Sequence, residues 1–184
     1  PDKVRVSMND VILTVATVGI PLLAAVMERV GSVGISERHH SHHDTFVLSS
    51  AFSHALVFAM LFMGLMGLVL GWLCSIGVFS ANPVVIHSFF VAFLAVMFVF
   101  WMIIRRFKVS LFDDQMIITP FLGGDVTVGY ADIESMEWTG FRKGTGYRDL
   151  AIYVGGRKVV TLVGVLDLEQ VLVRINRFDV LGRS

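Results

Sequence analysis

The chain has 184 residues, of which 55% are hydrophobic and 16% are charged. Soluble domains usually carry about 25% charged residues, so this composition indicates a membrane protein with room for one small soluble domain. The formal net charge is zero, and no basic stripe with interleaved aromatic residues occurs, which argues against a nucleic-acid partner. With Cys74 as its one cysteine, the chain has neither a disulfide framework nor a thiolate metal site.

Residues 1–30 form an apolar segment that is either membrane-embedded or interfacial. Its stretch Val11–Met27 holds 17 residues without a charge, the lower limit for a spanning helix. A thin polar stripe recurs at helical spacing in Asp10, Thr14, Thr17 and Pro21, and the proline should kink or divide the helix. We favour a third membrane helix whose stripe faces protein over a helix lying in the interface.

Residues 31–50 form a polar connector, in which glycine and serine predict a loop. Its histidines are weak candidates for metal ligands: His39, His40, His42 and His43. Neutral imidazoles bind zinc, copper and nickel, but adjacent histidines point in different directions and no distant Cys or His completes a set. We therefore expect a solvated loop that titrates near neutral pH rather than a metal site.

Residues 51–104 contain two long apolar runs, Ala51–Leu73 and Val84–Ile104, which hold no Lys, Arg, Asp or Glu. At 1.5 Å per residue, each run spans about 30 Å, which is the thickness of a bilayer's hydrocarbon core. A soluble core helix of this length would need a polar face. The pattern predicts a transmembrane helical hairpin.

The first helix of the hairpin carries Gly64, Gly67 and Gly71 close to one face. Small residues let helix backbones approach closely in lipid, where van der Waals packing drives association. These glycines therefore predict tight packing against a neighbouring helix. The neighbour could belong to this chain or to another protein.

His54 and His87 lie within the two apolar runs, and an ionisable residue in a span is a functional hypothesis by default. If the turn is centred near Val78, about 16 residues of helix, or about 24 Å, separate the two histidines in depth. This separation disfavours a shared haem between them and favours roles at opposite membrane surfaces. Ligation of a pigment or cofactor by one of them, or an interface with a partner subunit, is the alternative.

The cations Arg105, Arg106 and Lys108 follow the second apolar run directly, whereas the connecting turn has no charge. Lys and Arg accumulate on the cytoplasmic side of membranes, so we expect the following domain in the cytoplasm.

From residue 105 the pattern changes to short segments rich in β-branched and aromatic residues. The predicted strands are Phe107–Phe112, Gln115–Thr119, Asp125–Tyr130, Ile133–Thr139, Leu150–Val154 and Lys158–Val163. Asp167 can then cap a helix whose apolar stripe is Leu168, Val171, Leu172, Ile175 and Phe178. The fold expected for residues 105–184 is a small antiparallel roll or barrel closed by a C-terminal helix.

A membrane hairpin, a basic junction and the stretch Tyr130-Ala131-Asp132-Ile133-Glu134-Ser135 together resemble the bacterial PH-like domain proteins. The resemblance covers about residues 105 to 180, including Gln115–Thr119, Gly155-Gly156-Arg157-Lys158 and the terminal helix. It implies a PH-like fold and membrane-associated, non-catalytic roles. It also implies that the chain is integral to the bacterial cytoplasmic (inner) membrane, with the C-terminal domain in the cytoplasm. Some relatives in that family are photosynthetic-complex assembly factors.

No phosphate-binding loop, nucleophile elbow or metalloprotease helix occurs in the sequence, so we expect neither an enzyme nor a bound cofactor. The first hypothesis is an accessory, scaffold or assembly subunit that docks to a larger membrane complex through the glycine face. The second is an anionic-lipid-binding module. Its headgroup contacts would be Arg105, Arg106, Lys108, Arg142, Lys143 and Arg148. The third is cofactor ligation by His54 or His87.

Overall fold

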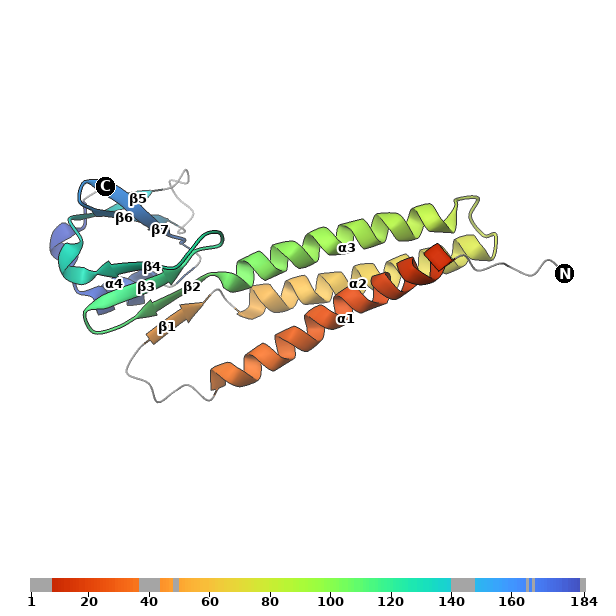
Figure 1. Cartoon of the computed structure of the whole chain (residues 1–184), viewed down its shortest axis with the longest axis horizontal. Coiled ribbons are helices and arrows are strands. Elements are labelled where there is room, and N and C mark those ends of the chain that lie inside the picture. Colours follow the sequence, from red (N-terminus) through yellow and green to blue (C-terminus); the bar gives the residue numbers. More distant parts are fainter. Residues whose placement is uncertain are drawn as a thin grey trace. The chain divides into compact units, whose positions relative to one another are not determined.

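A computed structural model describes residues 8–36, 44–47, 50–139, 148–164, 166 and 168–182. The chain forms two compact units (Figure 1). The helical unit comprises Pro1–His39 and Ala51–Met102, and the β unit comprises His40–Ser50 and Ile103–Ser184. The elements in order are α1 Met8–Ser36, β1 Asp44–Val47, α2 Ser50–Ser75, α3 Pro83–Arg106, β2 Lys108–Leu111, β3 Gln115–Thr119, β4 Val126–Gly129, η1 Tyr130–Asp132, β5 Ser135–Thr139, β6 Asp149–Val154, β7 Arg157–Leu162, α4 Leu168–Ile175 and η2 Phe178–Val180.

Three helices of the described chain are long and apolar enough to cross a membrane. The candidate spans are Met8–Gly31, Ser50–Ser75 and Pro83–Arg106. The predicted hairpin corresponds to α2 and α3, and α1 has the length and composition of a third span. Their buried contacts centre on Ala24, Val57, Met60, Leu94 and Trp101, which come from all three helices.

Helix α1 is longer than predicted. It runs across Pro21, so the proline does not divide it, and it continues to Ser36, past the glycine at which we expected a loop. Proline costs a helix one backbone hydrogen bond, which neighbouring helices can compensate in a membrane protein. The loop signal of glycine and serine is a weak prior that helix propagation overrides here.

The turn between α2 and α3 follows the expected pattern. Gly77 has φ +78°, a left-handed conformation that glycine adopts without strain. The side-chain oxygen of Asn82 accepts a hydrogen bond of 2.9 Å from the Val84 N–H, so Asn82 caps the start of α3.

The β unit contains two antiparallel sheets, with strand orders β1-β2-β3-β4 and β5-β6-β7. All six predicted strands form, each within two residues of its expected bounds. Of the two expected forms, a roll or a barrel, the closed barrel is wrong, because the described strands form two separate sheets. Gly155 and Gly156 make the turn between β6 and β7, with φ of +59° and +69°. Such a turn needs positive φ at both central residues.

Strand β1 was not predicted, because it lies inside the presumed connector. It pairs antiparallel with β2, from Asp44↔Leu111 to Val47↔Lys108. The hairpin of α2 and α3 is therefore inserted between two neighbouring strands of one sheet. The β unit consequently starts before the hairpin and not at residue 105.

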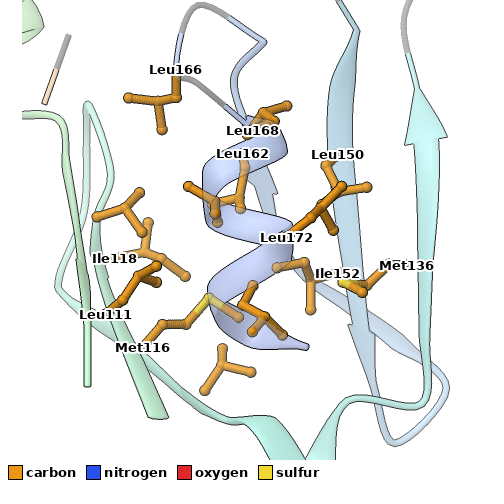
Figure 2. Close-up of a cluster of buried hydrophobic side chains, with 14 of the residues drawn as sticks. Leu111, Met116, Ile118, Met136, Leu150, Ile152, Leu162, Leu166, Leu168 and Leu172 are labelled. Atoms are coloured by element: carbon orange, nitrogen blue, oxygen red, sulfur yellow. The ribbon is translucent and has the colours of Figure 1, made fainter. Parts of the chain in front are cut away.

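The core of the β unit lies between its two sheets and around α4 (Figure 2). The first sheet contributes Leu111, Met116 and Ile118, the second contributes Met136, Leu150 and Ile152, and α4 contributes Leu168, Val171, Leu172 and Ile175. The predicted stripe of α4 is confirmed except for Phe178. Helix α4 ends at Ile175, followed by Asn176 with φ +53°, and Phe178 is 52% exposed.

We predict that Phe46→Ala, in β1, lowers the stability of the β unit by about 1–2 kcal/mol, although Phe46 precedes both hairpin helices, α2 and α3, in sequence. Phe46 packs, partly buried, against the core cluster that includes Leu111 and Met116. Hydrogen exchange of the β2 and β3 amides in the full chain measures the effect. Thr45→Ala, at an exposed position of the same strand, is the control; equal exchange in the two variants would contradict the assignment of β1 to this core.

Candidate functional site

The glycine face of α2 is filled by this chain's own helices. A Cβ atom added at Gly64 would lie 2.9 Å from the Thr17 carbonyl oxygen and 3.0 Å from Pro21 Cγ, both in α1. Pro21 has no N–H, so the Thr17 carbonyl, four residues earlier, lacks its helical donor. Gly64 thus leaves space for the part of α1 in which Pro21 interrupts the helical hydrogen bonds.

The next two glycines receive side chains of α3. A Cβ atom at Gly67 would lie 2.8 Å from Phe90 Cγ, and one at Gly71 would lie 2.1 Å from His87 Cε1. Phe90 and His87 are both buried. The neighbour that the sequence left open therefore belongs to this chain. A partner protein docked on this face would have to displace α1 and α3.

The polar stripe of α1 faces protein where it passes α2. Thr17 and Pro21 are buried, and the Thr17 hydroxyl donates to the Leu13 carbonyl at 2.8 Å. The Thr14 hydroxyl donates in the same way to the Asp10 carbonyl at 2.7 Å. These bonds keep both hydroxyls satisfied within the helix, so the stripe can pack in an apolar environment.

A polar cluster joins the three helices at one end of the helical unit. Ser53 Oγ donates to Glu28 Oε2 at 2.8 Å, and Trp101 Nε1 donates to Ser53 Oγ at 3.0 Å. His54 Nε2 lies 3.3 Å from Glu28 Oε1. Trp101 is fully buried, and the Glu28 side chain is 15% exposed. An acidic side chain this enclosed needs such partners, because burying an unpaired carboxylate is costly.

Only His54 of this cluster was singled out in the sequence. Glu28 follows the first apolar run, Ser53 lies in the first turns of α2, and Trp101 lies near the end of α3. Each residue alone looks like an ordinary interfacial residue. The antiparallel hairpin brings Ser53 and Trp101 to the same end of the helical unit. Their contact with Glu28 depends on how α1 packs against the hairpin, and local sequence patterns do not predict that packing.

The two candidate cofactor histidines do not come together. Each is the fifth residue of its helix, and α2 and α3 are connected as a hairpin, so His54 and His87 lie toward opposite ends. His87 is buried, and its Nδ1 lies 2.9 Å from the Pro83 carbonyl oxygen. One ring nitrogen of each histidine thus already has a polar neighbour. The weak metal candidates at residues 39, 40, 42 and 43 lie outside the described residues.

The cations after α3 have different surroundings. The guanidinium of Arg106 donates to the carbonyl of Gly123, in the turn between β3 and β4. Lys108 is exposed, and Arg105 is half-buried. Arg148 is exposed at the start of β6, while Arg142 and Lys143 lie outside the described residues. The structure therefore brings one candidate cation, Arg106, into direct contact with a loop of the β unit.

Polar side chains of the β unit form hydrogen bonds with backbone groups of the segments that connect its strands. Arg177 donates to the carbonyls of Tyr130 and Ile133, which flank the link between the two sheets. Arg177 Nε also donates to Asp179 at 2.9 Å, and this bond lowers the pKa of the Asp179 carboxyl. The Tyr130 hydroxyl donates to the Phe112 carbonyl, and burial raises the pKa of this phenol.

Comparisons of this chain with protein-family models, curated proteins and solved structures found no match.

We predict that Gly64→Leu destabilises the helical unit by about 1–3 kcal/mol, because its side chain would collide with the α1 backbone at Thr17. Gly19→Leu is the matched control within the membrane helices, since a Cβ atom there would meet nothing within 4 Å. Thermal unfolding in detergent compares the two variants. Equal midpoints would mean that α1 does not pack on this glycine.

We predict that Ser53→Ala costs about 1–3 kcal/mol of stability, because it leaves the Trp101 indole N–H and one Glu28 oxygen without this partner. In combination with Trp101→Phe the loss should be less than additive, since both changes remove the same bond. Ser88→Ala, at an exposed position of α3, is the control. Additive losses in a double-mutant cycle would show that the bond contributes nothing.

Proposed function

We propose that this chain is a non-catalytic accessory subunit of the cytoplasmic membrane, which holds a PH-like domain at the cytoplasmic surface for a larger membrane protein complex. The observation that carries this proposal is the insertion of the α2–α3 hairpin between the paired strands β1 and β2. A domain joined to its membrane helices by one flexible tether would not need a paired strand on each side of the hairpin.

The two connections to the hairpin are short. Residues 48 and 49 separate β1 from α2, and Phe107 alone separates α3 from β2. Because the two strands are hydrogen-bonded neighbours, the β unit is attached to membrane helices at two adjacent points. Short double connections restrict a domain far more than one flexible linker does. This restriction suits a platform that presents one surface to a partner in the same membrane.

The architecture of the β unit supports the PH-like part of the proposal. Four and then three antiparallel strands are followed by an amphipathic helix that packs on the core between the sheets (Figure 2). This order agrees with the resemblance noted at Tyr130–Ser135.

The use of polar groups in the β unit favours binding over chemistry. Glu134 accepts a hydrogen bond from the Gly156 N–H at 2.7 Å, and Asp149 accepts one from the Gly164 N–H at 2.8 Å. Together with Tyr130 and Arg177, these side chains bind backbone groups of turns and connections. Their roles are those of a rigid scaffold with surfaces available to a partner.

The test is gentle-detergent purification of the tagged chain from native membranes, followed by mass spectrometry and an absorption spectrum. We expect stoichiometric partner subunits with the native chain. Flexible Gly/Ser linkers of about eight residues, inserted at residues 48–49 and after Arg106, should reduce partner recovery by about tenfold or more, because they lower the effective concentration of the domain at its partner.

The control carries a linker of the same length after Ser80, in the exposed turn between α2 and α3, and should retain its partners. Protease resistance of the β unit establishes that each variant is folded. A native chain that purifies alone, or equal recovery from all three chains, would contradict the proposal. A coloured chain without partners would instead favour the cofactor hypothesis for His54 or His87.

A further inference from the structure

The turn between β3 and β4 comprises residues 120–125. It lies at the edge of the first sheet to which the hairpin helices α2 and α3 connect. Lys108 pairs with Val47 on one side and with Thr119 on the other. Val47 is the last residue before the link to α2, Lys108 is the second residue after α3, and Thr119 is the last residue before the turn. We call these three residues the membrane-end row. The register therefore places the β3–β4 turn at the same edge of the sheet as the chain segments that lead to α2 and come from α3.

Two contacts hold this turn against the end of α3. The Arg106 guanidinium, in the last residue of α3, donates to the Gly123 carbonyl. The ring of Phe107 stacks on that of Phe121, with centroids 4.5 Å apart and an interplanar angle of 20°. Gly123 has φ +101°, a conformation that glycine adopts without strain. The turn is thus folded back toward the helix and has defined side-chain and backbone partners there.

The apex of the turn is an exposed apolar residue. Leu122 is 73% exposed, and it lies between Phe121 and Gly123, which both contact the end of α3 or the residue after it. Val47, in the membrane-end row, is also exposed, and its pairing partner Lys108 is an exposed cation. Arg106, whose guanidinium contacts the turn, is exposed as well. Apolar side chains with adjacent cations are the composition of segments that bind the membrane interface.

The depth of the turn agrees with lipid contact. The headgroup region of each leaflet is about 5–7 Å thick, and Arg106 ends the candidate span. Lys108 follows two residues later, no more than about 7 Å farther along the chain. The bond from Arg106 brings Gly123 to the level of the helix end.

We infer that the β3–β4 turn is a lipid-contacting wedge, with Leu122 inserted at the boundary between headgroups and acyl chains of the leaflet in which α3 ends. The turn adds a direct lipid contact to the two covalent connections that join the β unit to the hairpin helices. It requires that α3 span the membrane, but it does not require a partner complex.

The test uses the full chain with Cys74→Ala and one introduced cysteine that carries an environment-sensitive fluorophore. The test position is Leu122→Cys. Val173→Cys, on the exposed face of α4, is the control in the β unit, and Val99→Cys, on an exposed face of α3, is the control in the membrane. Each chain is reconstituted in neutral phosphatidylcholine vesicles. Quenching is measured with lipids that carry a doxyl group near the headgroup and with aqueous iodide.

We expect doxyl lipid to quench the Leu122 label at least half as strongly as the Val99 label, with weak quenching by iodide. A Leu122 label that matches the Val173 label would overturn the inference. Shielding from iodide without doxyl quenching would also overturn it, because a protein surface and not lipid would then cover the turn. Loss of doxyl quenching at Val99 would overturn its premise that α3 spans. If Cys74→Ala does not fold, the same labels with Cys74 retained, corrected by the parent chain, provide the comparison.

Discussion

The pairing of β1 with β2 is the constraint on which the rest of the structure depends. These strands are separated in sequence by the whole α2–α3 hairpin, yet they pair over four residues down to the base of the hairpin. Closing such a long loop costs conformational entropy, and the hairpin reduces that cost because its own two helices already bring the ends together. The hairpin and the sheet therefore support each other, and the register of the sheet places the chain segments that lead to both hairpin helices at one edge.

Within the helical unit, close contact replaces the hydrophobic effect as the organising force. Lipid is as apolar as leucine, so the helices gain little by hiding apolar surface from it. The glycines at 64, 67 and 71 instead provide space for the α1 backbone, Phe90 and His87. The cluster of Glu28, Ser53 and Trp101 adds hydrogen bonds between all three helices at one end of the unit. The same features that suggested docking to another protein are explained by packing within the chain.

The β unit is organised by the ordinary hydrophobic effect, with α4 as the element that both sheets share. Its buried side chains meet those of each sheet, so neither sheet has to bury its apolar face alone (Figure 2). Arg177 then binds the link between the sheets from the segment that follows α4. A single chain thus uses two different driving forces, and the change between them occurs between the end of α3 at Arg106 and the start of β2 at Lys108.

The elements whose signal is local could be predicted from the residues of one segment. Uncharged runs long enough to span a bilayer, alternating strands between turn residues and the stripe of α4 all reflect burial that repeats along one segment. The role of β1, the partner of each glycine and the contact of Glu28 with Ser53 became known only from the three-dimensional arrangement. The four residues of β1 form a strand only because β2 supplies their hydrogen bonds. A small residue indicates where a neighbouring helix can pack closely, but it does not indicate which helix packs there. Such features depend on residues far apart in sequence, and periodicity and composition do not contain that information.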